Sequence, residues 1–102
     1  MTVSTSLLSD GGFSTLNITG ATNVLGRPGT VYKVVVNATA AKDSTIIDST
    51  GTTAAAGNTI LTIPASTTVG TIFTLNWPCM AGIAVVPGSG VTLAVSFGDN
   101  VG

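Results

Sequence analysis

Histidine is absent from this 102-residue chain, and charged side chains are scarce. Three Lys or Arg residues and four acidic residues leave a formal net charge of -1. Without histidine, the chain lacks the usual base for a hydroxyl nucleophile and the commonest metal ligand. Its three scattered cations do not form the basic field that nucleic-acid-binding domains present. We therefore expect a protein that is not an enzyme, binds no nucleic acid and carries no cofactor.

Cysteine and converging carboxylates are equally rare. The single cysteine, Cys79, excludes an internal disulfide framework. No cation is near it in the sequence, so we expect an inert, half-buried thiol. The carboxylates Asp43 and Asp48 are five residues apart, an odd spacing that places two residues on opposite faces of a strand. Because a metal site needs converging ligands, we expect no metal to be bound.

Long apolar runs are also missing, although the mean hydropathy is +0.61. No charged residue occurs between Asp48 and Asp99, yet three Pro and seven Gly interrupt this segment. A membrane-spanning helix needs about 20 mostly apolar residues in succession. We therefore expect no membrane association. The uncharged segment is interpreted as part of a β domain whose Thr-, Ser- and Gly-rich surface is partly covered by neighbouring subunits.

What the sequence does contain is a recurring β pattern. Short segments rich in β-branched residues are separated by Gly or Pro at intervals of roughly ten residues, and none has helical spacing. The pattern predicts strands at 13–18, 30–39, 44–49, 58–63, 71–77, 82–86 and 91–97. Residues 21–29 and 50–57 are expected to form turns and loops.

These strands predict one all-β domain over residues 13–102, an antiparallel β-sandwich or jelly-roll-like barrel of about seven or eight strands. Residues 1–12 are expected to form an N-terminal arm or a peripheral strand. Within the domain, the 30–39 segment is apolar on both faces near its centre, which is typical of a central strand. Val91, Leu93, Val95 and Phe97 alternate with Thr92, Ala94 and Ser96 and should share one face of the last strand. Pro78 is expected to end the 71–77 strand.

Five residues are candidates for contacts with a partner. Leu7 and Leu8 lie in the predicted arm, and Arg27 lies in a glycine-rich turn. Trp77 and Met80 form a hydrophobic corner, and both residue types are enriched in the cores of interfaces. The only Trp of a small sandwich is also often a core residue, so both interpretations of Trp77 stay open.

Four segments carry a resemblance to a known class of protein. They are 29–37 (GTVYKVVVN), 45–50 (TIIDST), 61–64 (LTIP) and 82–85 (GIAV). Their succession is similar to that in small β-sandwich structural proteins of tailed bacteriophages. The resemblance implies a capsid decoration, or cement, protein that binds the outer surface of the phage head and stabilises contacts between capsomers. It implies the major capsid protein and further copies of the chain, as a homodimer or homotrimer, as partners.

The location expected for such a protein is the capsid surface of the virion. Residues 1–6 carry no basic residue and residues 7–8 are too short for the apolar part of a signal peptide, so we expect synthesis in a host cytoplasm without export. Two alternatives remain open. One is another virion module, such as a head-fibre base or a tail component. The other is a carbohydrate-binding sandwich that uses Tyr32, or Trp77 with Asn76.

Overall fold

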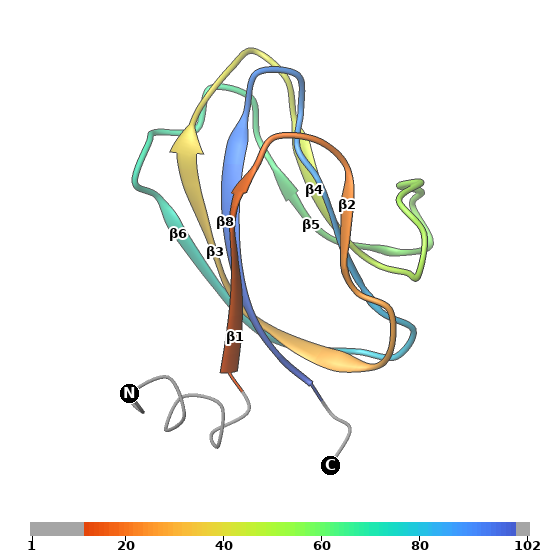
Figure 1. Cartoon of the computed structure of the whole chain (residues 1–102). Coiled ribbons are helices and arrows are strands. Elements are labelled where there is room, and N and C mark those ends of the chain that lie inside the picture. Colours follow the sequence, from red (N-terminus) through yellow and green to blue (C-terminus); the bar gives the residue numbers. More distant parts are fainter. Residues whose placement is uncertain (1–11, 100–102) are drawn as a thin grey trace.

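The computed structural model describes residues 12–99, which form two packed antiparallel sheets of four strands each (Figure 1). The strands are β1 (Gly12–Ile18), β2 (Thr22–Leu25), β3 (Gly29–Ala38), β4 (Ser44–Asp48), β5 (Thr59–Ile63), β6 (Ile72–Cys79), β7 (Ile83–Val86) and β8 (Thr92–Asp99). The first sheet has the order β1-β8-β3-β6, and the second sheet has the order β2-β7-β4-β5. The predicted all-β sandwich is confirmed.

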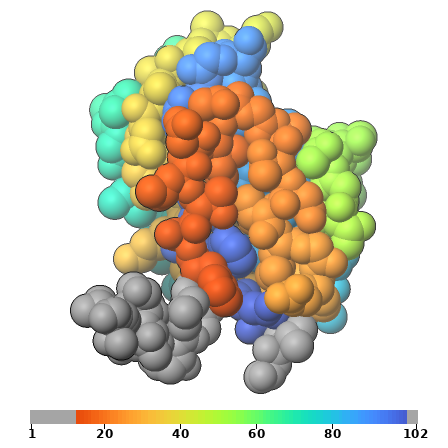
Figure 2. All heavy atoms as spheres, viewed as in Figure 1, coloured from red at the N-terminus to blue at the C-terminus, as the bar shows by residue number. Residues whose placement is uncertain are grey.

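Every connection except that between β4 and β5 crosses from one sheet to the other. Two four-stranded sheets wound from eight strands in this order make a jelly roll. The edge strands β1 and β2 lie side by side at one edge of the sandwich, as Figure 2 shows. Edges β6 and β5 border the opposite side of the two sheets. This winding brings the ends of distant segments together at the two ends of the sandwich.

The seven predicted segments correspond to seven of the eight strands, and the structure corrects two details. β2 lies inside residues 21–29, which were expected to be a turn, and its Leu25 is 8% exposed. Pro78 does not end β6, because it pairs with Thr30 and the strand continues to Cys79. β6 is an edge strand, where a proline that lacks an N–H costs no hydrogen bond to a second neighbour.

The core lies between the two sheets and is almost entirely aliphatic. Val91, Leu93, Val95 and Phe97 share one face, as predicted, and that face is directed into the core. In β3 the buried positions change from odd to even numbers, because the register with both neighbouring strands shifts between Val31 and Lys33. Such a bulge adds one residue to a strand and re-aims the side chains around it. The remaining core residues are Ile18, Leu25, Val31, Val34, Val36, Ile46, Ile63, Cys79, Ile83 and Val85.

Candidate functional site

One end of the sandwich gathers the beginnings of β1 and β3 and the ends of β6 and β8 (the lower end in Figure 1). Gly29, the first residue of β3, pairs with Cys79 of β6 on one side and with Asp99 of β8 on the other. A Cβ on Gly29 would collide with the Leu25 side chain and the Gly98 carbonyl oxygen. Glycine is therefore required here for the strands to approach one another closely.

An ion pair lies beside Gly29. Arg27, in the connection between β2 and β3, donates from Nε to Oδ2 of Asp99 at 2.8 Å, and its terminal nitrogen contacts the same oxygen. The hydrogen bond and the charge of Asp99 raise the pKa of Arg27 above its ordinary value. The Arg27 side chain is 56% exposed, so the guanidinium remains accessible from solvent. Arg27 is therefore an exposed cation, and its ion pair with Asp99 holds it in place.

The turn between β6 and β7 is fixed by a single carboxylate. Asp48 accepts hydrogen bonds from the backbone N–H groups of Met80, Ala81 and Gly82 at 2.9, 2.8 and 3.3 Å. Partial burial raises the pKa of Asp48, but these three hydrogen bonds together outweigh it and hold the pKa below its ordinary value. The turn that carries Met80 is therefore anchored to the end of β4.

Trp77 and Met80 are exposed at this end, at 52% and 79%. The core interpretation of Trp77 is thus wrong. Trp77 pairs with the core residue Val31, but it lies near the end of the edge strand β6, beside which the first sheet has no further strand. A bulge precedes it in β6, where Asn76 has a positive φ of 48°. We call Arg27, Trp77 and Met80 together the strand-end surface.

The neighbouring Cys79 has the opposite character. The sequence predicted a half-buried side chain, but the Cys79 side chain is fully buried. Burial raises the pKa of the Cys79 thiol to about 12, and the charge of Asp48 adds to the effect. A thiol with this pKa carries almost no thiolate at neutral pH, which agrees with the prediction of an inert group.

A second exposed surface is the outer face of the first sheet. Directly paired residues of antiparallel strands share a face, and Val35 pairs with both Ala94 and Ile72. Leu16 follows Thr15, which pairs with the core residue Val95, so Leu16 points to the outer face as well. Leu16 is 73% exposed and Ile72 is 58% exposed. These aliphatic residues, one from each strand, cross the whole sheet; we call Leu16, Val35, Ile72 and Ala94 the apolar row.

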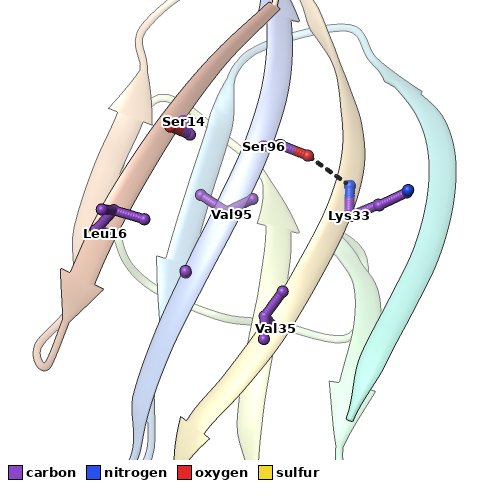
Figure 3. Close-up of a pocket in the computed structure, with 7 residues that line it drawn as sticks. Ser14, Leu16, Lys33, Val35, Val95 and Ser96 are labelled. Atoms are coloured by element: carbon purple, nitrogen blue, oxygen red, sulfur yellow. Dashed lines mark hydrogen bonds between the residues drawn. The ribbon is translucent and has the colours of Figure 1, made fainter. Parts of the chain in front are cut away.

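A shallow hollow of about 190 Å³ lies along part of this face (Figure 3). Leu16, Val35 and Ala94 of the apolar row line it together with the polar residues Ser14, Lys33 and Ser96. Val95 completes the lining. Ser96 Oγ accepts a hydrogen bond from the Lys33 backbone N–H at 3.2 Å. This bond fixes the serine at the bulge, and the floor of the hollow remains apolar.

The outer face of the second sheet is different. Ile46 and Val85 pair inside the core, so the next pair, Ile47 with Ala84, points outward, yet both residues are fully buried. In Figure 1 the connection between β4 and β5, residues 49–58, lies on this side of the sheet. Asn23 Nδ2 ties it down by donating to the carbonyl oxygens of Ser49 and Ile83 at 3.1 and 3.2 Å. The chain itself therefore covers Ile47 and Ala84 on this face.

The structure brings three of the five predicted contact residues, Arg27, Trp77 and Met80, to the same end of the sandwich. Leu7 and Leu8, with most of the predicted arm 1–12, lie outside the described residues, and β1 begins at Gly12. The apolar row was not predicted, because its members come from four strands and meet only through the sheet register. Alternation within each strand was the available signal, but it does not reveal which strands are neighbours.

The two carboxylates considered for a metal site serve separate connections. Asp43 accepts a hydrogen bond from the Ala65 backbone N–H at 2.8 Å, whereas Asp48 holds the β6–β7 turn. Within residues 12–99 no group of three or more His, Cys, Asp or Glu residues is arranged to hold a metal ion. Over the same range, no helix has the length and apolar character needed to cross a membrane. No family model, curated protein or solved structure matches the chain.

Proposed function

We propose that this protein is a structural component of a virion, a decoration protein that binds the outer surface of a tailed-phage head and stabilises contacts between capsomers. The strand-end surface makes the contact with the major capsid protein. The observation that carries the proposal is the exposure of Trp77 and Met80 at the end of a sandwich with very few charges. Large apolar side chains exposed together on a small domain mark an interaction site.

The binding energy of one such contact is small, so the proposed function depends on many identical contacts on the shell. Covering the exposed half of Trp77 removes roughly 100 Å² from water, which contributes about 2–3 kcal/mol before ordering costs. One such contact is weak, but a symmetric shell presents many copies of the same site. The Asp48 hydrogen bonds fix the Met80 turn in advance, which lowers the entropy lost on binding.

The fold and the sequence resemblance lend further support. Jelly rolls are common in viral capsid and lectin domains, although the fold alone does not determine the function. The resemblance to phage β-sandwich proteins extends over four segments, which correspond to β3, β4, β5 and β7. A chain with three cations and four carboxylates is also suited to dense packing against neighbours, since few charges must be desolvated.

The test uses heads of the phage that encodes this chain, prepared without the protein. Purified protein should bind them saturably and raise their resistance to heat, and cosedimentation with the heads measures the binding of wild type and variants alike. The double variant Trp77→Ser, Met80→Ser should lose at least tenfold in affinity. Val69→Ser is the matched control, since Val69 is 54% exposed and precedes the opposite end of β6. Absence of binding at micromolar concentration would refute the proposal.

A second candidate function, carbohydrate binding, is favoured by one specific observation. Trp77 is exposed directly beside Asn76, which is also exposed, and an aromatic face with an amide is a common combination in sugar sites. Glycan-array binding that Trp77→Ser abolishes would replace the capsid proposal. A few copies per particle, instead of hundreds, would favour a head-fibre base or a tail component.

A further inference from the structure

The strand β6 forms an open edge of the first sheet. Among residues 12–99 it pairs with β3 alone, so one side of its backbone has no neighbouring strand. At the other side of the sandwich the edge strands β1 and β2 lie side by side (Figure 2). Native proteins usually protect an open edge with charged residues, proline or a bulge, because such an edge pairs readily with a further strand.

The protection of β6 is confined to its second half. A bulge lies at Asn76 and Pro78 follows it, and both features disturb pairing with a further strand. The first three residues, 72–74 (IFT), contain no charge and no proline, and their register with β3 is regular. Ile72 is 58% exposed and Thr74 is exposed as well. We call residues 72–74 the open strip.

The register shows which backbone groups of the open strip are available. Val36 exchanges hydrogen bonds of 3.0 and 2.7 Å with the segment just before β6, so its N–H and C=O point to that side. The groups of Val34, two residues earlier, point the same way, because neighbouring residues of a strand alternate in direction. Phe73 is the partner of Val34 and turns its groups towards β3. Ile72 and Thr74, on either side of Phe73, therefore turn theirs towards the open edge.

Backbone groups in this arrangement fit an extended polypeptide segment. In β-strand addition, main-chain hydrogen bonds supply affinity and the neighbouring side chains supply selectivity. The Ile72 side chain lies on the outer face of the sheet, in the apolar row. Cross-strand neighbours on one face contact each other, so the added segment should place an aliphatic side chain beside Ile72.

The open strip is too short to hold a partner by itself. Three residues span about 10 Å, and pairing over this length buries far less than the roughly 600 Å² per partner at which stable interfaces begin. The strip therefore suits a partner that is already bound nearby. Trp77 of the strand-end surface lies on the same strand, at most about 17 Å from Ile72. One extended segment of about six or seven residues reaches both.

We propose that an extended segment of the major capsid protein adds to β6 as a further strand of the first sheet, along the open strip, and continues to Trp77. This inference rests on the proposed function, since it names the form of the capsid segment that the strand-end surface binds. Pairing of two copies of this chain through the same edge is the competing outcome, and the tests distinguish it.

The first test removes one N–H from the open edge. Thr74→Pro should lower the affinity for phage heads at least about tenfold in cosedimentation, because proline donates no hydrogen bond to the added strand. The pairing with β3 loses no hydrogen bond, since the Thr74 N–H points away from it. Thr74→Val keeps this N–H and should bind as wild type does. Urea unfolding shows whether the variants are folded.

The matched control is Thr62→Pro in β5, the edge strand of the other sheet. The Asp48 N–H donates to the Asn58 carbonyl oxygen at 2.8 Å, so it points to the side of β5. Ile46, two residues earlier, points the same way, and its partner is Leu61. Thr62 follows Leu61, so its N–H faces the open side of β5. The control therefore removes an equivalent N–H from the wrong edge and should not weaken binding.

The outcomes separate this inference from the proposed function. Wild type that binds no heads refutes both. If wild type binds and the double variant Trp77→Ser, Met80→Ser does not, normal binding by Thr74→Pro refutes the added strand alone. Equal losses in Thr74→Pro and Thr62→Pro also overturn it. A wild-type dimer in sedimentation equilibrium that Thr74→Pro dissociates would assign the edge to a second copy and overturn the proposal.

Hydrogen exchange remains informative even if the proline variant folds poorly. In wild-type protein bound to heads, the amides of Ile72 and Thr74 should exchange at least about tenfold more slowly than in the free protein, because the added strand accepts their hydrogen bonds. The Thr62 amide should keep its rate. Mass spectrometry after quenching measures the exchange. Unchanged rates at Ile72 and Thr74 on saturated heads would overturn the proposal.

Discussion

The outer faces of the two sheets of this jelly roll carry similar side chains but differ in how far those side chains are exposed. Each carries aliphatic residues at outward positions: Ile47 and Ala84 on the second sheet, Val35 and Ile72 on the first. The pair on the second sheet is fully buried, whereas Ile72 is 58% exposed. The difference arises from a connection, residues 49–58, and from the hydrogen bonds of Asn23 that secure its start. Position in the sheet also contributes, since Ile47 and Ala84 lie on inner strands and Ile72 lies on the edge strand β6.

This comparison separates two roles for an outward aliphatic residue. Where the chain covers the residue, it contributes to the stability of the fold in the same way as a core residue. Where the chain leaves it open, it contributes little to stability and is available to a partner. The predictions below measure this difference directly.

The largest expected effect is on stability at the covered face. Ile47→Ala should lower the free energy of unfolding by about 2–4 kcal/mol, because it removes a fully buried side chain and leaves a cavity. Ile72→Ala should change it by no more than about 0.5 kcal/mol. Urea unfolding compares the two variants. Similar losses at both positions would abolish the distinction between the faces.

Glycines on the two sides provide a second comparison. A Cβ on Gly82 would lie 2.7 Å from the Leu25 carbonyl oxygen and 2.8 Å from that of Ser49, and neither backbone group can easily move. A Cβ on Gly98 would collide with the Tyr32 ring, the far end of a movable side chain. Gly82→Ala should therefore cost about 1–3 kcal/mol, and Gly98→Ala less than about 1 kcal/mol. Thermal unfolding measures both, and the reverse order would show that the Tyr32 side is the rigid one.

The sequence was sufficient to predict the sandwich and one complete core strand. Alternation in the last strand correctly placed Val91, Leu93, Val95 and Phe97 on one face, because this pattern depends only on local geometry, and the structure shows that this face is buried. β2 was missed because Gly26, Pro28 and Gly29 follow it closely and are typical of a turn, and because its Asn23 is held by carbonyl oxygens of residues as distant as Ile83. Such partners cannot be identified from the local sequence.

The candidate surfaces were predictable only in part. Trp77 and Met80 were recognised by residue type, but alternation does not show that Trp77, which pairs with the core residue Val31, lies on an edge strand where its side chain is exposed. The apolar row required the register of four strands, two of which, β1 and β8, lie at opposite ends of the domain sequence. Likewise, Ile47 looks like any outward residue until the fold shows it to be fully buried.

A smaller effect is expected from acid, through the carboxylate that links the two sheets at the strand-end surface. The pKa of Asp48 is lower in the folded protein than its ordinary value, so its contribution is fully present above that value and is lost as pH falls through the folded pKa. Wild-type stability should thus fall more steeply below about pH 4 than that of Asp48→Asn. Urea unfolding at several pH values tests this. Parallel curves would show that the three N–H hydrogen bonds do not favour the ionised form.

The smallest expected effect concerns Arg27, which belongs to the connection between the two sheets and pairs with Asp99 of the first. Because the Arg27 side chain is 56% exposed and screened by water, Arg27→Ala should change the unfolding midpoint only slightly, although its partner Asp99 is 12% exposed. The same variant should weaken binding to phage heads if the guanidinium contacts the capsid. A clear loss of stability without a loss of binding would assign Arg27 to the fold, in the manner of Ile47. The opposite result would place it with Trp77 and Met80, on the part of the molecule that remains open to partners.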